Sequence, residues 1–234
     1  MEKINISIII PTYNECENII LLVKEIERLF LRVNSKYEII IVDDNSNDGT
    51  YKKIKQLKSR FVNLYIRKKV RGLASAILFG IKKAKGEIMI GMDADFNHPP
   101  EKIIDLIEGL KTNDLVVASR FMKGGGMEDK IRFIFTYIFN LFLKYVLGFP
   151  TMDNMSGFYA IKKEKLLHLP INKIYTGYGE YHLRLVYLAK KQGLRIKEIP
   201  VFYPKRKYGH SKTNFFKMFF RYLFVAFDLK LRNG

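Results

Sequence analysis

The chain has 234 residues, of which 48% are hydrophobic and 27% charged, a composition that fits a folded globular protein and excludes a disordered or fibrous one. Its single cysteine, Cys16, excludes a disulfide within the chain and favours a reducing compartment. The net charge of +18 is uneven, since residues 1–120 carry 20 Lys and Arg against 16 Asp and Glu (+4), and residues 121–234 carry 21 against 7 (+14). We therefore expect the C-terminal half to be attracted to anionic lipids, phosphorylated ligands or nucleic acid.

The first 120 residues alternate between apolar runs of strand length and helical patterns. We expect no cleaved leader, because Met1-Glu2-Lys3 leads directly into a short apolar run. Strands are expected over 4–11, 37–42, 63–67, 87–92 and 115–119, and helices over 16–31, 50–59, 73–83 and 100–110. Ile and Val runs joined by helices predict an α/β fold with a mostly parallel, Rossmann-like sheet and helices on both faces. The sequence has neither a GxGxxG fingerprint nor a Walker A loop.

Polar clusters follow four of the expected strands. They are Pro11-Thr12-Tyr13-Asn14-Glu15, Asp43-Asp44, the group Asp93, Asp95 and Asn97, and Arg120. Ligands of parallel sheets bind outside the carboxyl ends of the strands, so we expect these clusters to share one site.

The group of Asp93, Asp95 and Asn97 predicts a metal site. A buried carboxylate without a partner costs many kcal/mol, and a hard divalent cation with oxygen ligands is a suitable partner that also bridges to a phosphate. The alternative is an ordinary polar turn, because Asp, Asn and Pro are also common turn residues.

Two helices rich in aromatic and basic residues are expected in the second half, over 131–146 and 214–229. The first has a narrow polar stripe of Arg132, Thr136, Asn140 and Lys144. Neither is long and apolar enough to cross a bilayer. Two interpretations stay open: the helices pack as core, or they lie in a membrane interface with Lys and Arg at the headgroups.

Several motifs together resemble the GT-A glycosyltransferases of family 2. They are Pro11-Thr12-Tyr13-Asn14-Glu15, Val42-Asp43-Asp44-Asn45-Ser46, Asp93-Ala94-Asp95-Phe96-Asn97-His98-Pro99-Pro100-Glu101 and Ala118-Ser119-Arg120-Phe121. Met155-Ser156-Gly157-Phe158-Tyr159-Ala160 and Arg206-Lys207-Tyr208-Gly209-His210-Ser211-Lys212 narrow the resemblance to dolichyl-phosphate mannose synthases and related polyprenyl-phosphate enzymes. The resemblance implies a GT-A domain over 1–212, with an interfacial helix inserted at about 130–147, and a C-terminal amphipathic helix over 213–234.

The resemblance also implies roles for particular residues on the donor side. A nucleotide-sugar would be held by Pro11, Tyr13, Glu15, Val42, Asp44, Ala94, Arg206 and Lys212. Mg²⁺ or Mn²⁺ would bind Asp93, Asp95 and Asn97, where the family usually has Gln in place of Asn97. The catalytic residues would be Asp95 and Arg120.

On the acceptor side, a lipid phosphate would contact Arg120, Arg132 and Thr136. Such a phosphate is already ionised near pH 7 and needs no general base, whereas a sugar hydroxyl would need one. Glu180 is the candidate base in the second case. Its alternative role is that of a solvated residue opening a helix that runs through Lys190.

The expected function is inverting transfer of a hexose, mannose from GDP-mannose, to dolichyl or polyprenyl phosphate at the cytoplasmic face of a membrane, with the protein bound peripherally. A UDP-sugar donor, or elongation of a lipid-linked or capsular glycan, is the alternative, and the need for a small membrane partner subunit is left open. Nucleic acid is not expected as a partner, because acidic residues at a phosphate-binding surface repel phosphates unless a metal is bound.

Overall fold

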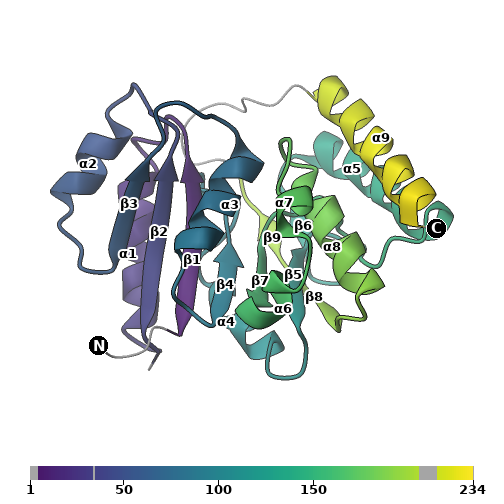
Figure 1. The fold of residues 1–234 in the computed structure, drawn as a ribbon, viewed down its shortest axis with the longest axis horizontal. Coiled ribbons are helices and arrows are strands. Elements are labelled where there is room, and N and C mark those ends of the chain that lie inside the picture. The colour runs from purple at the N-terminus through teal and green to yellow at the C-terminus, as the bar shows by residue number, and fades with distance from the viewer. Residues whose placement is uncertain (1–4, 34, 206–214, 234) are drawn as a thin grey trace.

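The computed structural model describes residues 5–33, 35–205 and 215–233, and in 215–217 and 233 only the backbone. Its central sheet has the strand order β3-β2-β1-β4-β7-β5-β8 (Figure 1). The strands are β1 (Ile6–Thr12), β2 (Tyr37–Asp43), β3 (Val62–Ile66), β4 (Ile88–Gly91), β5 (Leu115–Ser119), β7 (Tyr159–Lys162) and β8 (Ile196–Pro200). The expected α/β fold with a mostly parallel sheet is confirmed.

One strand runs against the others. β7 lies between β4 and β5 and is antiparallel to both, so β4 and β5 keep the same direction. A small second sheet pairs β6 (Gly126–Met127) with β9 (Phe202–Tyr203). None of β6 to β9 was predicted, because these strands are short and carry no long Ile/Val run.

Helices cover both faces of the sheet. They are α1 (Ile19–Phe30), α2 (Thr50–Gln56), α3 (Leu73–Lys83), α4 (Lys102–Gly109), α6 (Lys163–Leu167), α7 (Ile171–Ile174) and α8 (Tyr181–Lys191). The core on one face joins α1 and α4 to the sheet, and the core on the other joins α3 and α8. The spacing of apolar residues predicted α1 to α4, although α2 ends at Gln56 rather than 59, and Lys58 follows with a left-handed φ of +49°. The short helices α6 and α7 were not predicted, and α8 was expected only as the helix that Glu180 would open.

A third apolar cluster lies beside the sheet. It joins α5 (Lys130–Leu141) and its π-helical continuation η1 (Phe142–Val146) to α8 and to α9 (Phe215–Asn233). The three helices lie together at one end of the molecule, away from α1 and α2 (Figure 1). Both expected aromatic helices therefore form, and each buries one side in this cluster.

Candidate active site

The polar clusters meet at one edge of the sheet, as expected. The carboxyl ends of β1, β2, β4 and β5 all lie there, and two cavities open along this edge. Leu73, Asp93 and Tyr178 line both cavities, which therefore form one continuous site. We call the cavity beside β1 and β2 the first cavity and the one beside β5 and α5 the second cavity.

Most of the residues predicted to bind a donor line the first cavity. Its wall includes Pro11, Tyr13, Glu15, Asp44, Asp93, Ala94 and Asp95. Val42 differs, because its side chain is fully buried in the core on the α3 side. Val42 therefore supports the strand rather than the cavity wall.

Asp44 is fixed by a loop that the sequence did not single out. Its Oδ1 accepts a hydrogen bond from Arg67 Nε at 2.6 Å, and its Oδ2 accepts one from the backbone N–H of Gly72 at 2.7 Å. Arg71, in the same loop, lies over the ring of Tyr13 and donates to its hydroxyl at 3.1 Å. The sequence feature that could have predicted this part of the first cavity is the basic run 67–72, which follows the third strand.

The acidic motif is held in place by His98. The Nδ1 of His98 accepts from the backbone N–H of Asp93 at 2.8 Å, so the proton of the neutral ring lies on Nε2, 3.2 Å from the carbonyl oxygen of Ser156. Burial lowers the pKa of His98 to about 4. His98 is thus a neutral structural link between the loops after β4 and before β7, with its ring stacked on Phe158.

The donor atoms of the motif suit a hard divalent cation. Asp95 is 5% exposed, and its two oxygens accept from the backbone N–H and the side-chain amide of Asn97, both at 3.2 Å. Asp93 has 38% of its side chain exposed and lines both cavities. Among the described residues no cluster of three His, Cys, Asp or Glu could hold a metal. Two carboxylates fit Mg²⁺, which commonly takes one or two carboxylates together with substrate phosphates.

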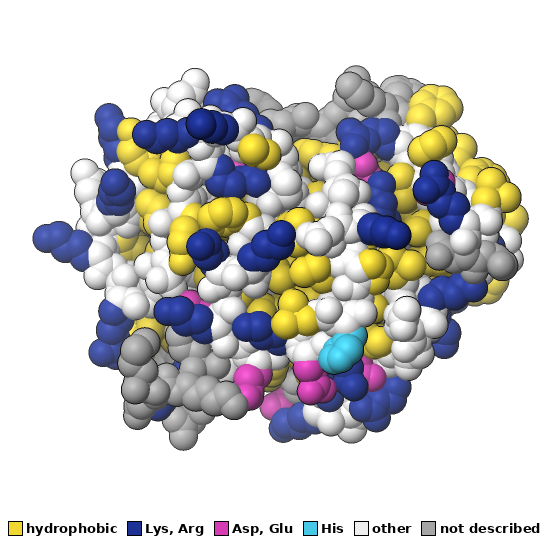
Figure 2. Space-filling model, in the orientation of Figure 1, with side chains coloured by type: hydrophobic (Ala, Val, Ile, Leu, Met, Phe, Trp, Pro, Cys, Tyr) yellow, Lys and Arg dark blue, Asp and Glu magenta, His cyan; other side chains and the backbone are white. Residues whose placement is uncertain are grey.

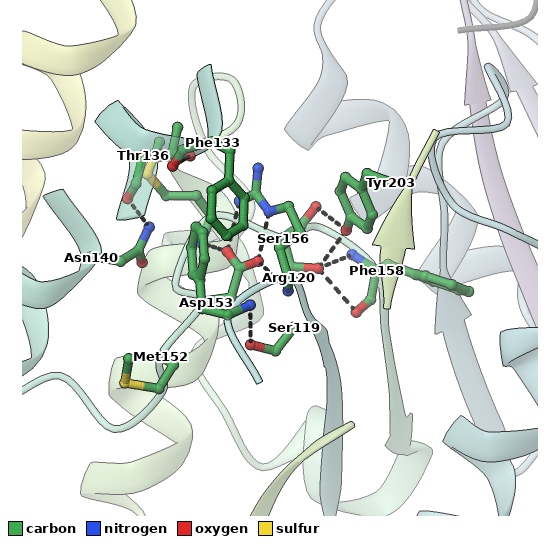
Figure 3. A network of polar contacts seen from close by, with 12 residues as sticks. Ser119, Arg120, Phe133, Thr136, Asn140, Met152, Asp153, Ser156, Phe158 and Tyr203 are labelled. Atoms are coloured by element: carbon green, nitrogen blue, oxygen red, sulfur yellow. Dashed lines mark hydrogen bonds and ion pairs between the residues drawn. The ribbon is translucent and has the colours of Figure 1, made fainter. Parts of the chain in front are cut away.

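Arg120 is buried beneath the second cavity in an ion pair with Asp153 (Figure 3). The Nε and Nη2 of Arg120 donate to the two oxygens of Asp153 at 2.7 Å each, and the guanidinium carbon lies 5.1 Å from the centre of the Tyr203 ring. Burial alone would raise the pKa of the Asp153 carboxyl, but the charge and hydrogen bonds of Arg120 hold it below its usual range. One edge of the guanidinium is therefore occupied by Asp153.

The loop that carries Asp153 is held by a polar network. Glu198 on β8 accepts from the backbone N–H groups of Met152 and Asp153 at 2.8 and 3.0 Å. Asn140 on α5 accepts from the backbone N–H of Asn154 at 2.8 Å. No sequence motif predicted Asp153 as the partner of Arg120, because the pairing depends on the antiparallel strand β7 lying between β4 and β5.

Arg132 and Thr136, which were predicted to bind the acceptor phosphate, also line the second cavity. Thr136 is 5% exposed, and its hydroxyl donates to the Arg132 carbonyl oxygen at 2.7 Å. Asp129 caps the helix by accepting from the backbone N–H of Arg132 at 3.0 Å. The polar stripe of α5 thus faces the protein interior and the cavity.

Glu180 is not a solvated residue at the start of a helix, which corrects that alternative. It is 2% exposed, because α9 packs over it. Its carboxylate accepts from the Arg221 guanidinium and from the backbone N–H of Tyr178. Arg206 and Lys212, predicted to bind the donor phosphates, lie outside the described residues.

Comparisons with known proteins place the chain among glycosyltransferases. The profile of Glycosyl transferase family 2 matches residues 7–169. Dolichol-phosphate mannosyltransferase of Pyrococcus furiosus is 34% identical over 93% of this chain, which spans 61% of that relative's length. Dolichol-phosphate mannosyltransferase of Saccharomyces cerevisiae is 32% identical, over 91% of this chain and 82% of its own length. Undecaprenyl-phosphate mannosyltransferase of Micrococcus luteus is 28% identical, over 88% and 86%.

Solved structures share the fold at lower sequence identity. Glucosyl-3-phosphoglycerate synthase from Mycobacterium tuberculosis, in complex with Mn²⁺, UDP-glucose and phosphoglyceric acid, superposes with a TM-score of 0.72 and 20% identity, covering 97% of this chain and 79% of that one. At this identity the likeness shows the fold alone, and it confirms the expected GT-A architecture.

Proposed function

The chain belongs to glycosyl transferase family 2, and we propose that it transfers mannose from GDP-mannose to a dolichyl or polyprenyl phosphate at the cytoplasmic face of a membrane. The names of the relatives from P. furiosus, S. cerevisiae and M. luteus support a polyprenyl-type phosphate as acceptor and mannose as the transferred sugar. The continuous pair of cavities provides a place for each substrate.

In this proposal the first cavity holds the nucleotide-sugar. Tyr13 and Arg71 would cover the base, and Asp93 and Asp95 would hold a divalent cation, with Asn97 orienting Asp95. When bound, the cation would stabilise the negative charge that develops on the departing nucleoside diphosphate. Arg206 and Lys212 would add positive charge on the same phosphates.

The observation that carries the proposal is the charge of the second cavity. Arg120 and Arg132 line it, and two cations would hold an anionic acceptor in line and offset its repulsion with the donor. A lipid phosphate oxygen attacks without giving up a proton, so no general base is required. Consistent with this, the Glu180 carboxylate is already engaged by Arg221 and by the N–H of Tyr178.

The outer surface of the second half supports binding to a membrane interface. On α5 the polar stripe faces inward, whereas Ile131, Ile134, Phe135 and Ile138 are 55–72% exposed. On α9 Phe220, Phe224 and Leu231 are 65–84% exposed, and hydrophobic side chains gather over this helix in Figure 2. A helix of a soluble protein normally shows the opposite pattern. Within the described residues no helix is long and apolar enough to cross a membrane.

Isothermal titration of the purified protein tests the donor. We expect GDP-mannose to bind in the presence of Mn²⁺, and binding to be lost with EDTA or in Asp95→Ala. Asp105→Ala is the matched control, because Asp105 is half exposed on α4 and pairs with the surface residue Lys102. Tighter binding of UDP-glucose or UDP-GlcNAc would keep the site and change the donor, and no metal-dependent binding of any of the three would refute the proposed function.

A further inference from the structure

We propose that Glu180 is a positioning residue that, together with Arg221, docks the C-terminal helix α9 onto the amino end of α8 and so completes the wall of the second cavity. This inference rests on the proposed function only for the identity of the acceptor. The docking itself is a property of the fold and is measured separately.

The two oxygens of Glu180 have different partners. Oε1 accepts from Arg221 Nη2 at 2.5 Å, and Oε2 accepts from the backbone N–H of Tyr178 at 3.1 Å. Only 3% of the Glu180 side chain is exposed, against 41% for Arg221. A carboxylate removed from water to this degree needs a charged or hydrogen-bonded partner, and α9 supplies one.

The arginine of α8 near Glu180 contributes its charge, but its hydrogen bond goes elsewhere. Arg184 begins the next turn of the helix, but its Nη1 donates to the carbonyl oxygen of Thr176 at 3.0 Å. Arg221 is therefore the arginine that donates to Glu180, and loss of Arg221 would leave the carboxylate with the Tyr178 N–H alone among these contacts.

Two glycines allow α9 to approach this closely. A Cβ at Gly179 would lie 2.6 Å from the hydroxyl oxygen of Tyr222, and a Cβ at Gly177 would lie 2.1 Å from Glu180 Oε1 and 2.9 Å from Arg221 Nη2. Gly177 also has a left-handed φ of +75°, which favours glycine. A larger residue at either position would force these side chains out of the contacts they make here.

The docked helix reaches the reaction site. Met218 and Tyr222 of α9 line the second cavity together with Arg132 and Thr136 of α5. Tyr222 is 6% exposed, whereas Phe224, two residues further on, is 73% exposed. The contact between Glu180 and Arg221 therefore fixes which side of α9 faces the cavity and which side faces outward.

This role differs from that of a general base. A base must present a carboxylate oxygen to the acceptor, whereas the side chain of Glu180 is only 3% exposed and is not among the residues that line the second cavity. It also differs from a purely local role at the start of α8, because the partner lies 41 residues away in sequence.

Hydrogen–deuterium exchange of the full chain tests the docking. We expect amides of residues 218–231 to exchange roughly ten-fold faster in Arg221→Gln, as for loss of one charge-assisted hydrogen bond. Glu180→Gln should have a smaller effect in the same peptides, and the double variant should exchange no faster than Arg221→Gln alone, because the two residues act as a pair. Arg232→Gln is the matched control, since it removes an exposed arginine of α9 that pairs with Asp228.

The docking is refuted if α9 exchanges in Arg221→Gln as it does in Arg232→Gln, or if Glu180→Gln loosens only α8.

A transfer assay with a short-chain polyprenyl phosphate adds the functional readout. Arg221→Gln should raise the acceptor KM several-fold and leave the GDP-mannose KM unchanged. Glu180→Gln with a large loss of kcat, unchanged acceptor KM and unchanged α9 exchange would make Glu180 a base. If the wild type transfers nothing to this acceptor, the proposed function fails and exchange still decides the docking.

Discussion

At the scale of single residues, the ion pair of Arg120 and Asp153 connects stability to the site. Asp153 is fully buried and Arg120 has 4% of its side chain exposed, so each charge depends on the other. The same pairing leaves Arg120 with a fixed orientation against the second cavity. A rigid, single orientation is what a residue that holds a phosphate in line requires.

We predict that Asp153→Asn lowers the free energy of unfolding by about 3 kcal/mol, because it leaves a buried guanidinium without a counter-charge. Urea unfolding measures the loss. Asp105→Asn breaks an exposed pair with Lys102 and should change stability by less than about 1 kcal/mol. Arg120→Met combined with Asp153→Asn should be less destabilised than Asp153→Asn alone, and equal effects of the two Asp→Asn variants would contradict the prediction.

Two buried histidines predict how stability depends on pH. Burial lowers the pKa of both His98 and His182 to about 4, against about 6.5 in an unfolded chain. Between these values the unfolded state binds more protons, so stability falls as the pH falls, by up to about 1.4 kcal/mol per pH unit for each histidine. Below about pH 4 their contribution stops changing.

His182→Leu should remove half of this histidine-dependent slope between pH 6.5 and 4 without lowering stability at pH 7. Within the described part of the chain neither ring nitrogen of His182 has a hydrogen-bond partner, so an apolar residue loses no bond. Urea unfolding across this pH range is the measurement, with the exposed His168→Gln as control. A slope in His182→Leu as steep as that of the wild type would show that His182 is not the group responsible.

At the scale of elements, the sequence predicted those strands and helices that depend on a local pattern of residues. Continuous Ile and Val runs identified β1, β2 and β5, and the turn residues after each strand located the edge where the site lies. Local pattern could not show β7, a four-residue strand whose place between β4 and β5 is decided by long-range pairing. The partners that depend on β7, Asp153 above all, were missed for the same reason.

The sequence also could not predict which side of α5 is buried and which is exposed. A helix with one polar stripe and apolar residues elsewhere fits either a buried helix or an interfacial one. The structure contains both features: Phe139 and Leu143 pack in the third cluster, and Ile134 and Ile138 are more than half exposed. Tertiary packing therefore had to decide which side of the helix is covered.

At the scale of the whole molecule, charge and exposed apolar surface coincide. The half of the chain with a balance of +14 contains α5 and α9, whose exposed residues are mainly Ile and Phe. Lysine and arginine attract anionic headgroups, and aromatic side chains then enter the acyl boundary. The second cavity is lined by residues of both helices, Thr136 of α5 and Tyr222 of α9 among them, so binding through these helices would bring a lipid acceptor to Arg120 and Arg132.

We predict that the protein binds vesicles of anionic phospholipid, and that Phe224→Ser weakens the partition coefficient roughly ten-fold through lost apolar burial. Co-sedimentation measures the partition. Leu31→Ser is the matched control, since Leu31 is 86% exposed at the end of α1, a helix that lies on the opposite side of the molecule from α9 (Figure 1). Salt at about 1 M shortens the screening length to about 3 Å and should remove the electrostatic share while leaving the apolar share. Equal partition of the two variants, with binding abolished by salt, would mean that charge alone holds the protein and that the exposed faces of α5 and α9 do not enter the bilayer.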